Sequence, residues 1–151
     1  MRKSCLLITI CCLLLVSPGA QASSTPPHQI SIKIGSSVMN ADGRPMTMDI
    51  APFILHQRAY VELLPLTKAL NIAPNKVFWD ADNKAVMLTI EGEDIVLAVG
   101  DRDEETTLGT IVMDVPPLDI HGHLVVPVRY VAEALGYSVA WDGKHRAVTI
   151  R

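Results

Sequence analysis

The residues best suited to chemistry form the short run Asp119-Ile120-His121-Gly122-His123. Residues two apart on a β-strand point to the same side, so the two imidazoles could share a metal ion. Two histidines do not complete a site, and a third ligand would have to come from Asp119 or from a distant histidine. The distant candidates are His28, His56 and His145. We favour turn or solvent roles for these histidines, and we predict no metal and no other cofactor.

Nucleophilic catalysis needs a hydroxyl or thiol with a base and an orienting acid close by. No serine of the predicted ordered region lies in a glycine-framed elbow, and carboxylate pairs such as Asp80 with Asp82 lie in polar turns. These serines are Ser31, Ser36, Ser37 and Ser138. There is also no phosphate-binding glycine loop and no helix with paired histidines. The sequence therefore predicts a protein that is not an enzyme, with a small hydrolase or metal protein as the least favoured alternative.

Trp79 and Trp141 could stack on sugar rings, as exposed aromatic residues of wall-binding modules do. Aromatic residues make up only 5% of the chain, so we favour packing in the core or at a sheet edge. A carbohydrate-binding face is the alternative. It predicts that aromatic side chains are exposed and coplanar along a groove, the candidates being Trp79, Trp141, Tyr130 and Tyr137.

The elements that must position these residues are clearest between Leu124 and Asp142, where the sequence reads as strand, helix, cap and strand. Pro127 suits the first turn of a helix, and Gly136 suits its left-handed end. Apolar residues at i, i+3, i+4 and i+7 predict the helix between them. This stripe comprises Val128, Val131, Ala132 and Leu135. Arg129 and Glu133 lie four apart on another face, which is typical of a local helix contact.

The same series occurs earlier in the chain at one constant offset, which becomes slightly shorter after the helix because the first copy carries a small insertion there. Corresponding pairs include Ile30 and Ile95, Gly35 and Gly100, Asp49 and Asp114, His56 and His121, and Trp79 and Trp141. This pattern predicts an α+β fold of two tandem β-β-β-α-β-β repeats, residues 30–90 and 95–151, which share one core of antiparallel strands wrapped around short helices.

The expected elements of the first repeat are three strands, a short helix and a hairpin. The strands are 30–34, 46–50 and 59–63, the helix is 65–70 with Asn71 as its cap, and the hairpin joins 76–79 to 85–90. The last strand of the first repeat should pair with residues 95–99. We also expect residues 148–150 to pair with 30–34, which would bring the two ends of this domain together.

Residues 1–22 have the three parts of a secretory signal peptide, with predicted cleavage after Ala22. Arg2 and Lys3 precede an apolar run, 6–16, that is too short to span a membrane. All three cysteines lie within this segment, so the exported chain would contain none. Residues 23–29 are polar and contain prolines, which is typical of a tether. The predicted protein is therefore secreted, with no membrane span in the mature chain.

The charge balance argues against a polyanionic partner. The chain has 13 basic and 16 acidic residues, and loss of Arg2 and Lys3 leaves 11 basic ones and a formal charge near minus five. Nucleic acid is therefore disfavoured as a partner. Part of the excess lies in the acidic run 101–105, which we interpret as a solvated loop.

The segment V-V-P-V-R-Y-V-A-E-A-L-G-Y-S-V-A-W-D and the closing A-V-T-I resemble the copper amine oxidase N-terminal-like domain, also called the stalk domain, of secreted bacterial proteins. His123 stands where arginine is common in that pattern, whereas Arg58 keeps the arginine in the first repeat. Four other positions of the first repeat depart from the pattern's proline, second arginine, glutamate and glycine. These are Glu62, Leu64, Lys68 and Asn71.

The resemblance implies antiparallel strands around a helix and a non-catalytic accessory role. The copper and quinone chemistry of the amine oxidases belongs to a separate, larger domain, so the family name implies no copper site here. We therefore expect a secreted accessory module, residues 30–151, that contacts an unknown protein or cell-envelope component.

Overall fold

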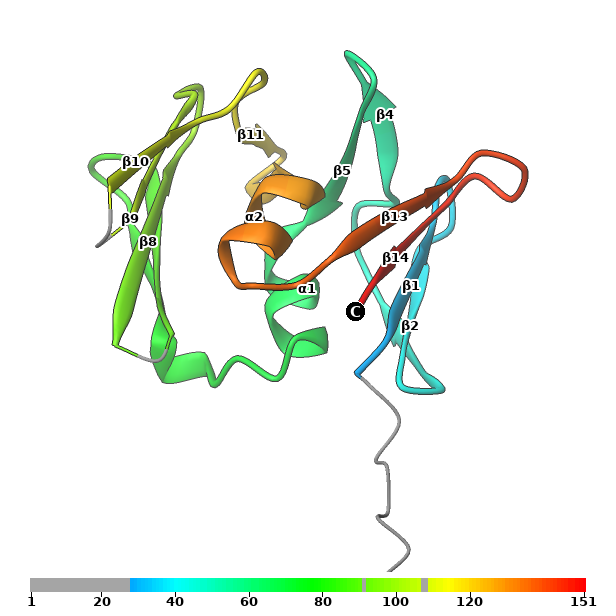
Figure 1. Ribbon diagram of the computed structural model, residues 1–151. Helices are drawn as coiled ribbons and strands as arrows, with labels where there is room; N and C mark the ends of the chain where they lie inside the picture. The colour runs from blue at the N-terminus through cyan, green and yellow to red at the C-terminus, as the bar shows by residue number, and fades with distance from the viewer. Residues whose placement is uncertain (1–27, 91, 107–108) are drawn as a thin grey trace, which may run out of the picture.

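The computed structural model describes residues 28–90, 92–106 and 109–151. The predicted signal peptide and most of the tether lie outside these residues. The described chain is α+β, with two short helices and strands whose pairings are all antiparallel. Figure 1 shows a sheet on each side of the molecule, with both helices between them.

The first sheet contains both ends of the domain. Its order is β13 (Val139–Asp142), β14 (Ala147–Ile150), β1 (Ile30–Lys33), β2 (Val38–Ala41) and β3 (Arg44–Thr47). Ile30 pairs with Ile150, and Lys33 pairs with Ala147. The expected pairing of the first and last strands is therefore confirmed.

The second sheet is a meander of consecutive strands. Its order is β10 (Gly109–Val112), β9 (Asp103–Thr106), β8 (Glu93–Ala98), β7 (Ala85–Ile90) and β6 (Val77–Asp80), and a 3-10 turn at Pro74–Lys76 precedes it. Both expected hairpins, β6 with β7 and β7 with β8, are present. The backbone of the acidic run is not all loop, because Asp103 pairs with Val112 as the first residue of β9.

A third, four-stranded sheet links the two halves of the chain. Its order is β11 (Leu118–Ile120), β12 (His123–Pro127), β5 (Arg58–Glu62) and β4 (Phe53–Leu55). Within this sheet the two halves meet in the β5–β12 pair, in which Val61 lies opposite Val126 and Glu62 lies opposite Val125. This register is the feature that positions the candidate site.

Each central strand of this third sheet leads directly into a short helix, α1 (Leu63–Ala69) after β5 and α2 (Val128–Ala134) after β12. The helix ends follow the sequence: Asn71 has φ +57° and Gly136 has φ +79°, the left-handed conformation that closes a helix. Pro127 is the N-cap of α2, one residue before the expected first turn. No helix among the described residues is long and apolar enough to cross a membrane.

The main core lies where the helices meet the sheets. Its fully buried residues come from both helices and all three sheets, including Leu66, Val131, Ile32, Leu88 and Val126. A smaller cluster packs on the other face of the third sheet around Tyr60, Val115 and Val125. Tyr60 stacks on Phe53 with ring centroids 5.3 Å apart, and its hydroxyl donates to the Pro116 carbonyl at 2.8 Å.

Two expectations need correction. Five strands precede the helix in each half instead of three, because strands such as β2 and β4 are too short to show a period in the sequence. Neither tryptophan is in the core: Trp79 is 45% exposed on β6 and Trp141 is 47% exposed on β13. Both strands are edges of their sheets, so only the sheet-edge part of that expectation holds.

Candidate functional site

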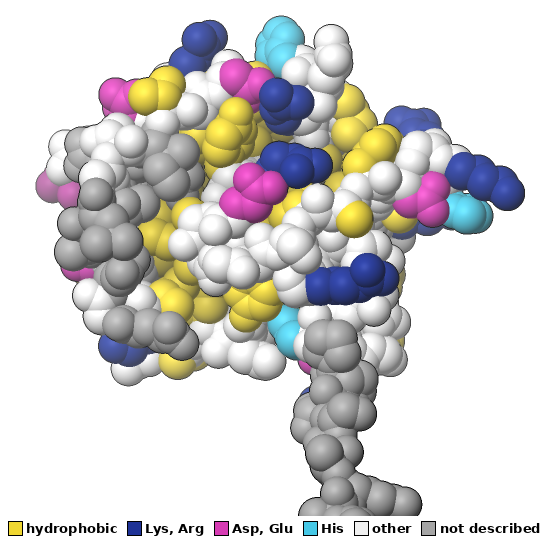
Figure 2. Space-filling model, viewed as in Figure 1, with side chains coloured by type: hydrophobic (Ala, Val, Ile, Leu, Met, Phe, Trp, Pro, Cys, Tyr) yellow, Lys and Arg dark blue, Asp and Glu magenta, His cyan; other side chains and the backbone are white. Residues whose placement is uncertain are grey.

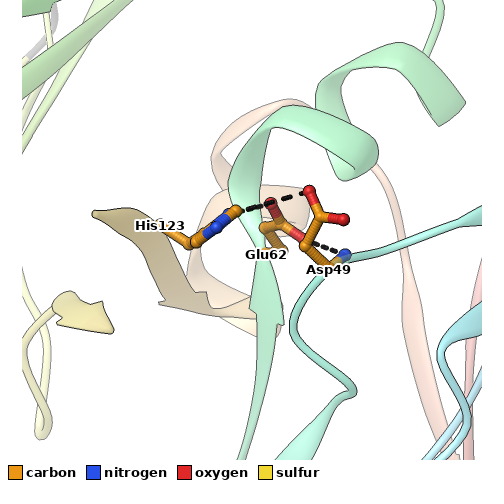
Figure 3. Close-up of side chains that lie close together, drawn as sticks. All are labelled: Asp49, Glu62 and His123. Carbon is orange, nitrogen blue, oxygen red and sulfur yellow. Dashed lines mark hydrogen bonds and ion pairs between the residues drawn. The ribbon is translucent and has the colours of Figure 1, made fainter. Parts of the chain in front are cut away.

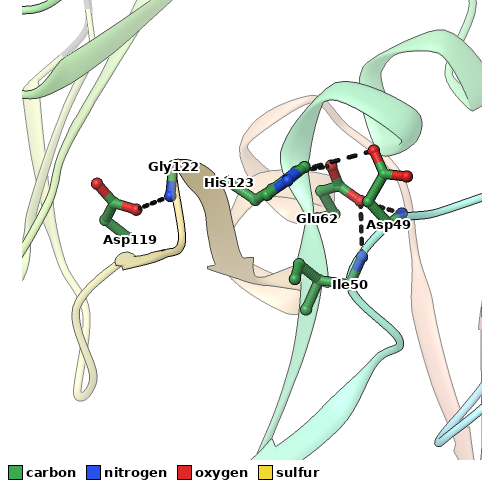
Figure 4. Close-up of polar contacts among 6 residues, drawn as sticks. All are labelled: Asp49, Ile50, Glu62, Asp119, Gly122 and His123. Carbon is green, nitrogen blue, oxygen red and sulfur yellow. Dashed lines mark hydrogen bonds and ion pairs between the residues drawn. The ribbon is translucent and has the colours of Figure 1, made fainter.

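His121 and Asp119 shape the turn between β11 and β12. His121 has φ +54°, and the Asp119 carboxylate accepts a hydrogen bond from the Gly122 N–H at 2.7 Å (Figure 4). Because β11 ends at Ile120 and β12 begins at His123, His121 and His123 are not on one strand with their side chains on the same face. A metal ion shared by the two histidines would need that arrangement. The turn role of His121 is therefore confirmed, and neither His121 nor Asp119 lies within hydrogen-bond distance of the His123 imidazole in the contacts described.

The distant histidines also lie elsewhere. His56 has φ +48° in the turn between β4 and β5, as expected. The His28 imidazole bonds to Asp42, and that of His145 bonds to Asp142 at 2.6 Å. The structure therefore brings none of the three to His123.

His123 instead meets two carboxylates that the sequence did not suggest as ligands. Its Nδ1 lies 2.7 Å from Glu62 Oε1 and 3.9 Å from Asp49 Oδ2 (Figure 3). The other carboxylate oxygen of Glu62, Oε2, accepts backbone N–H bonds from Asp49 at 2.8 Å and Ile50 at 3.2 Å. The Glu62 side chain is only 5% exposed, whereas that of His123 is 34% and that of Asp49 is 81% exposed. A buried carboxylate thus joins the end of β5, the start of β12 and the segment after β3.

The register of the third sheet brings Glu62 and His123 together. Glu62 lies opposite Val125, and His123 is two residues from Val125, so the two side chains are diagonal neighbours on one face. The same face carries the apolar cluster around Tyr60 and Val125, and the polar pair of Glu62 and His123 lies at the edge of that cluster. The end of β5 then fixes the buried carboxylate just before α1.

The charges of this group favour a protonated imidazole. The hydrogen bond that the imidazole donates to Glu62 raises the pKa of His123, and the negative charges of Glu62, Asp49 and Asp119 act in the same direction against the effect of burial. A protonated imidazole at this position neutralises a carboxylate that is otherwise buried without a counterion.

A second ionic group lies at the positions that correspond in the predicted repeat. Asp114 corresponds to Asp49, and Arg58 corresponds to His123. Arg58 binds Asp114 through two nitrogens, with Nε 3.1 Å from Oδ1. The Tyr130 hydroxyl also donates to Asp114 at 3.0 Å. These bonds lower the pKa of Asp114, the one from Arg58 most strongly.

Near this second group lies a pocket of about 450 Å³. Trp141 forms part of its wall, and its charged lining residues are Arg58 and Arg129. The remaining lining residues are Ile54, Gln57, Ala59, Pro127, Val128, Val139 and Val148. Arg129 bonds to Glu133 at 3.1 Å, as expected for a local helix contact. Figure 2 shows a basic and an acidic side chain together over α2, with apolar surface on both sides.

Comparison with known families gives a match for most of the chain. Residues 40–150 match the model of the copper amine oxidase N-terminal domain. The chain belongs to this family. No curated protein and no solved structure matches it.

The group formed by Asp49, Glu62 and His123 can now be compared with the sequence pattern of the copper amine oxidase N-terminal domain that this chain resembles. Glu62 and His123 are two of the positions at which the sequence departs from the pattern it resembles, and in the structure these two side chains are in contact. The available sequence signal was a single acidic residue, Glu62, inside the apolar stretch from Ala59 to Leu66. Asp49 gave no such signal, because its place in the group depends on the fold.

We expect acid to remove the stabilisation that Asp114 provides. Its pKa is lower in the folded protein than the unperturbed value of 3.8, so its contribution is present above about pH 4 and is lost as the pH falls through the folded-state pKa. Asp114→Asn should therefore lower the free energy of unfolding at pH 7 and lower it less at pH 2.5. Urea unfolding at both pH values measures this.

Asp82→Asn, at another exposed aspartate, is the control for net charge. A deficit of Asp114→Asn that is equally large at both pH values would show that Asp114 acts by packing and not by its charge.

Proposed function

We propose that this protein is a secreted, non-catalytic accessory module that contacts a protein or cell-envelope component through the pocket beside Trp141. The observation that carries the proposal is the half-exposed indole of Trp141 in a pocket whose two charged lining residues are arginines. Exposed Trp and Arg side chains are the types that most often dominate binding energy. Family membership supports an accessory role, and the leader-like segment 1–22 supports export.

The roles of the polar residues also support a module without catalysis. The hydroxyls of Ser36 and Ser138 bond to backbone carbonyls, at 3.0 Å and 3.2 Å. The Asp80 carboxylate accepts backbone N–H bonds from Asp82 and Asn83, which is a turn role. These groups therefore have local structural partners.

We also infer that residues 30–90 and 95–151 are tandem repeats. Supporting this, α1 begins at Leu63 and α2 at Val128, which is the same offset that relates Ile30 to Ile95, and each helix follows a central strand of the third sheet. The repeats would then differ at the surface, since the pair of Arg58 and Asp114 corresponds in position to the pair of His123 and Asp49.

Carbohydrate binding is the second candidate, and the exposure of both tryptophans favours it. The two lie on different sheets, and Trp79 does not line the pocket that contains Trp141. A sugar would therefore stack on Trp141 alone and not along a row of aromatic rings.

The test compares two matched substitutions, Trp141→Ala and Trp79→Ala, in retention by purified cell wall and by a membrane-protein extract. Both tryptophans are on edge strands with nearly equal exposure, so both variants should keep a cooperative thermal transition. We expect Trp141→Ala to reduce retention at least tenfold and Trp79→Ala to leave it unchanged.

The identity of the retained material separates the two candidates. Retention of a discrete protein supports the accessory role, and retention by wall polysaccharide alone supports carbohydrate binding. Equal retention of both variants would rule out the Trp141 pocket as the contact surface.

A further inference from the structure

We propose that Asp49, Glu62 and His123 form a binding site for a divalent transition-metal ion such as Zn²⁺. Each residue offers one ligand atom, and the three atoms lie within 4.8 Å of one another. They come from three separate parts of the chain, which the fold brings to one point (Figure 3). The proposal does not depend on the pocket beside Trp141.

The geometry requires only small movements. Zinc binds nitrogen and carboxylate oxygen at about 2.0–2.2 Å, which places tetrahedral neighbours about 3.3 Å apart. His123 Nδ1 now lies 2.7 Å from Glu62 Oε1 and 3.9 Å from Asp49 Oδ2. Replacing the proton between His123 and Glu62 by an ion would separate those atoms by about half an ångström. Asp49 must approach by a similar amount, and its 81% exposed side chain is not held by packing.

Glu62 is held in the orientation that a ligand needs. Its Oε2 accepts two backbone N–H bonds, from Asp49 and Ile50, and this leaves Oε1 directed at the imidazole (Figure 4). Bonds of this kind to a ligating carboxylate orient it toward a metal ion. Because the Glu62 side chain is 5% exposed, surrounding residues also restrict its rotation.

The ligand types select the class of ion. Two carboxylates and one neutral imidazole carry a total charge of minus two, which a divalent cation balances. An imidazole nitrogen among so few ligands favours zinc or a similar transition metal over calcium, which takes six to eight oxygens. The exposed side of the group leaves a fourth position open to water or to a residue of a partner.

The corresponding group in the other half of the chain is an ion pair that has no metal-binding nitrogen. There Arg58 binds Asp114, and a guanidinium has no lone pair for a metal. His123 takes the place of Arg58, and Glu62 takes the place of Pro127. Both differences exchange a residue that cannot bind a metal for one that can.

The experiment is isothermal titration of the untagged, EDTA-treated chain with ZnCl₂ at pH 7.5, with CaCl₂ in parallel. We expect one equivalent of Zn²⁺ to bind with micromolar or tighter affinity and to raise the melting temperature by several degrees, and we expect no response to Ca²⁺. The decisive variant is His123→Arg, which keeps a cation beside Glu62 but removes the nitrogen ligand. It should fold and lose zinc binding.

Asp49→Asn removes an exposed ligand and should weaken binding at least tenfold, whereas Asp114→Asn, at the corresponding position, should not change it. Failure of the wild-type chain to bind Zn²⁺ would overturn the proposal. Unchanged affinity in both His123→Arg and Asp49→Asn would also overturn it, since the ion would then bind at other residues such as His28 or His145.

Discussion

Glu62→Ala should lower the free energy of unfolding by about 2–4 kcal/mol, because a buried donor that loses its acceptor costs about 1–3 kcal/mol. The substitution leaves two backbone N–H groups, of Asp49 and Ile50, without their acceptor and leaves His123 without its nearest counterion. It also leaves a gap beside the residues where β5 becomes α1. Urea unfolding at pH 7 measures the loss.

Two further variants separate the causes of this loss. Glu62→Gln keeps an oxygen acceptor but removes the charge, so its loss should be intermediate. Glu133→Ala removes an exposed ion-paired glutamate on α2 and should cost less than about 1 kcal/mol. If Glu62→Ala destabilised the protein no more than Glu133→Ala does, the carboxylate would not hold the three segments together.

Deletion of residues 147–151 should abolish cooperative folding. β14 lies between β13 and β1, so its loss removes the ladder partner of both strands. It also removes the buried side chains of Val148 and Ile150, which belong to the main core. Large-to-small changes at single buried sites already cost several kcal/mol, a large part of the stability of a small domain.

Circular dichroism during heating and the dispersion of amide NMR signals test this deletion. The control is Ile150→Val in the complete chain, which removes one buried methylene and should cost about 0.5–1.5 kcal/mol with the transition retained. A truncated chain that melts cooperatively near the temperature of the complete chain would contradict the prediction.

The helices, their ends and the closing strand pair could be predicted from the sequence because local patterns encode them. Asn71 and Gly136 mark the two left-handed helix ends, and both have positive φ. The β1–β14 pair followed from the match between the two halves of the sequence, which relates it to the β7–β8 hairpin. The two added strands, β2 and β4, are stabilised by neighbours and not by their own composition.

The charged group could not be predicted, because it depends on a register between strands that are far apart in the chain. A shift of one residue in the β5–β12 pair would turn His123 away from Glu62. No local pattern records that register. The sequence instead suggested a pairing of His121 with His123, which the turn at Gly122 separates. For the tryptophans the sequence left core, sheet-edge and exposed positions open, since a strand at a sheet edge reads like any other strand in the sequence.

The antiparallel pairing of β1 with β14 has a mechanical consequence. Ile30 and Ile150 lie opposite each other at one end of the pair, so chain segments attached before β1 and after β14 would extend from the same edge of the domain. A load applied between the two ends would open this pair in the unzipping direction, one set of hydrogen bonds after another, and would not shear all of them at once. A domain tethered in this way adds almost no reach to a longer protein and resists tension poorly. Its geometry suits the display of a surface at the side of a chain, and it does not suit a load-bearing spacer.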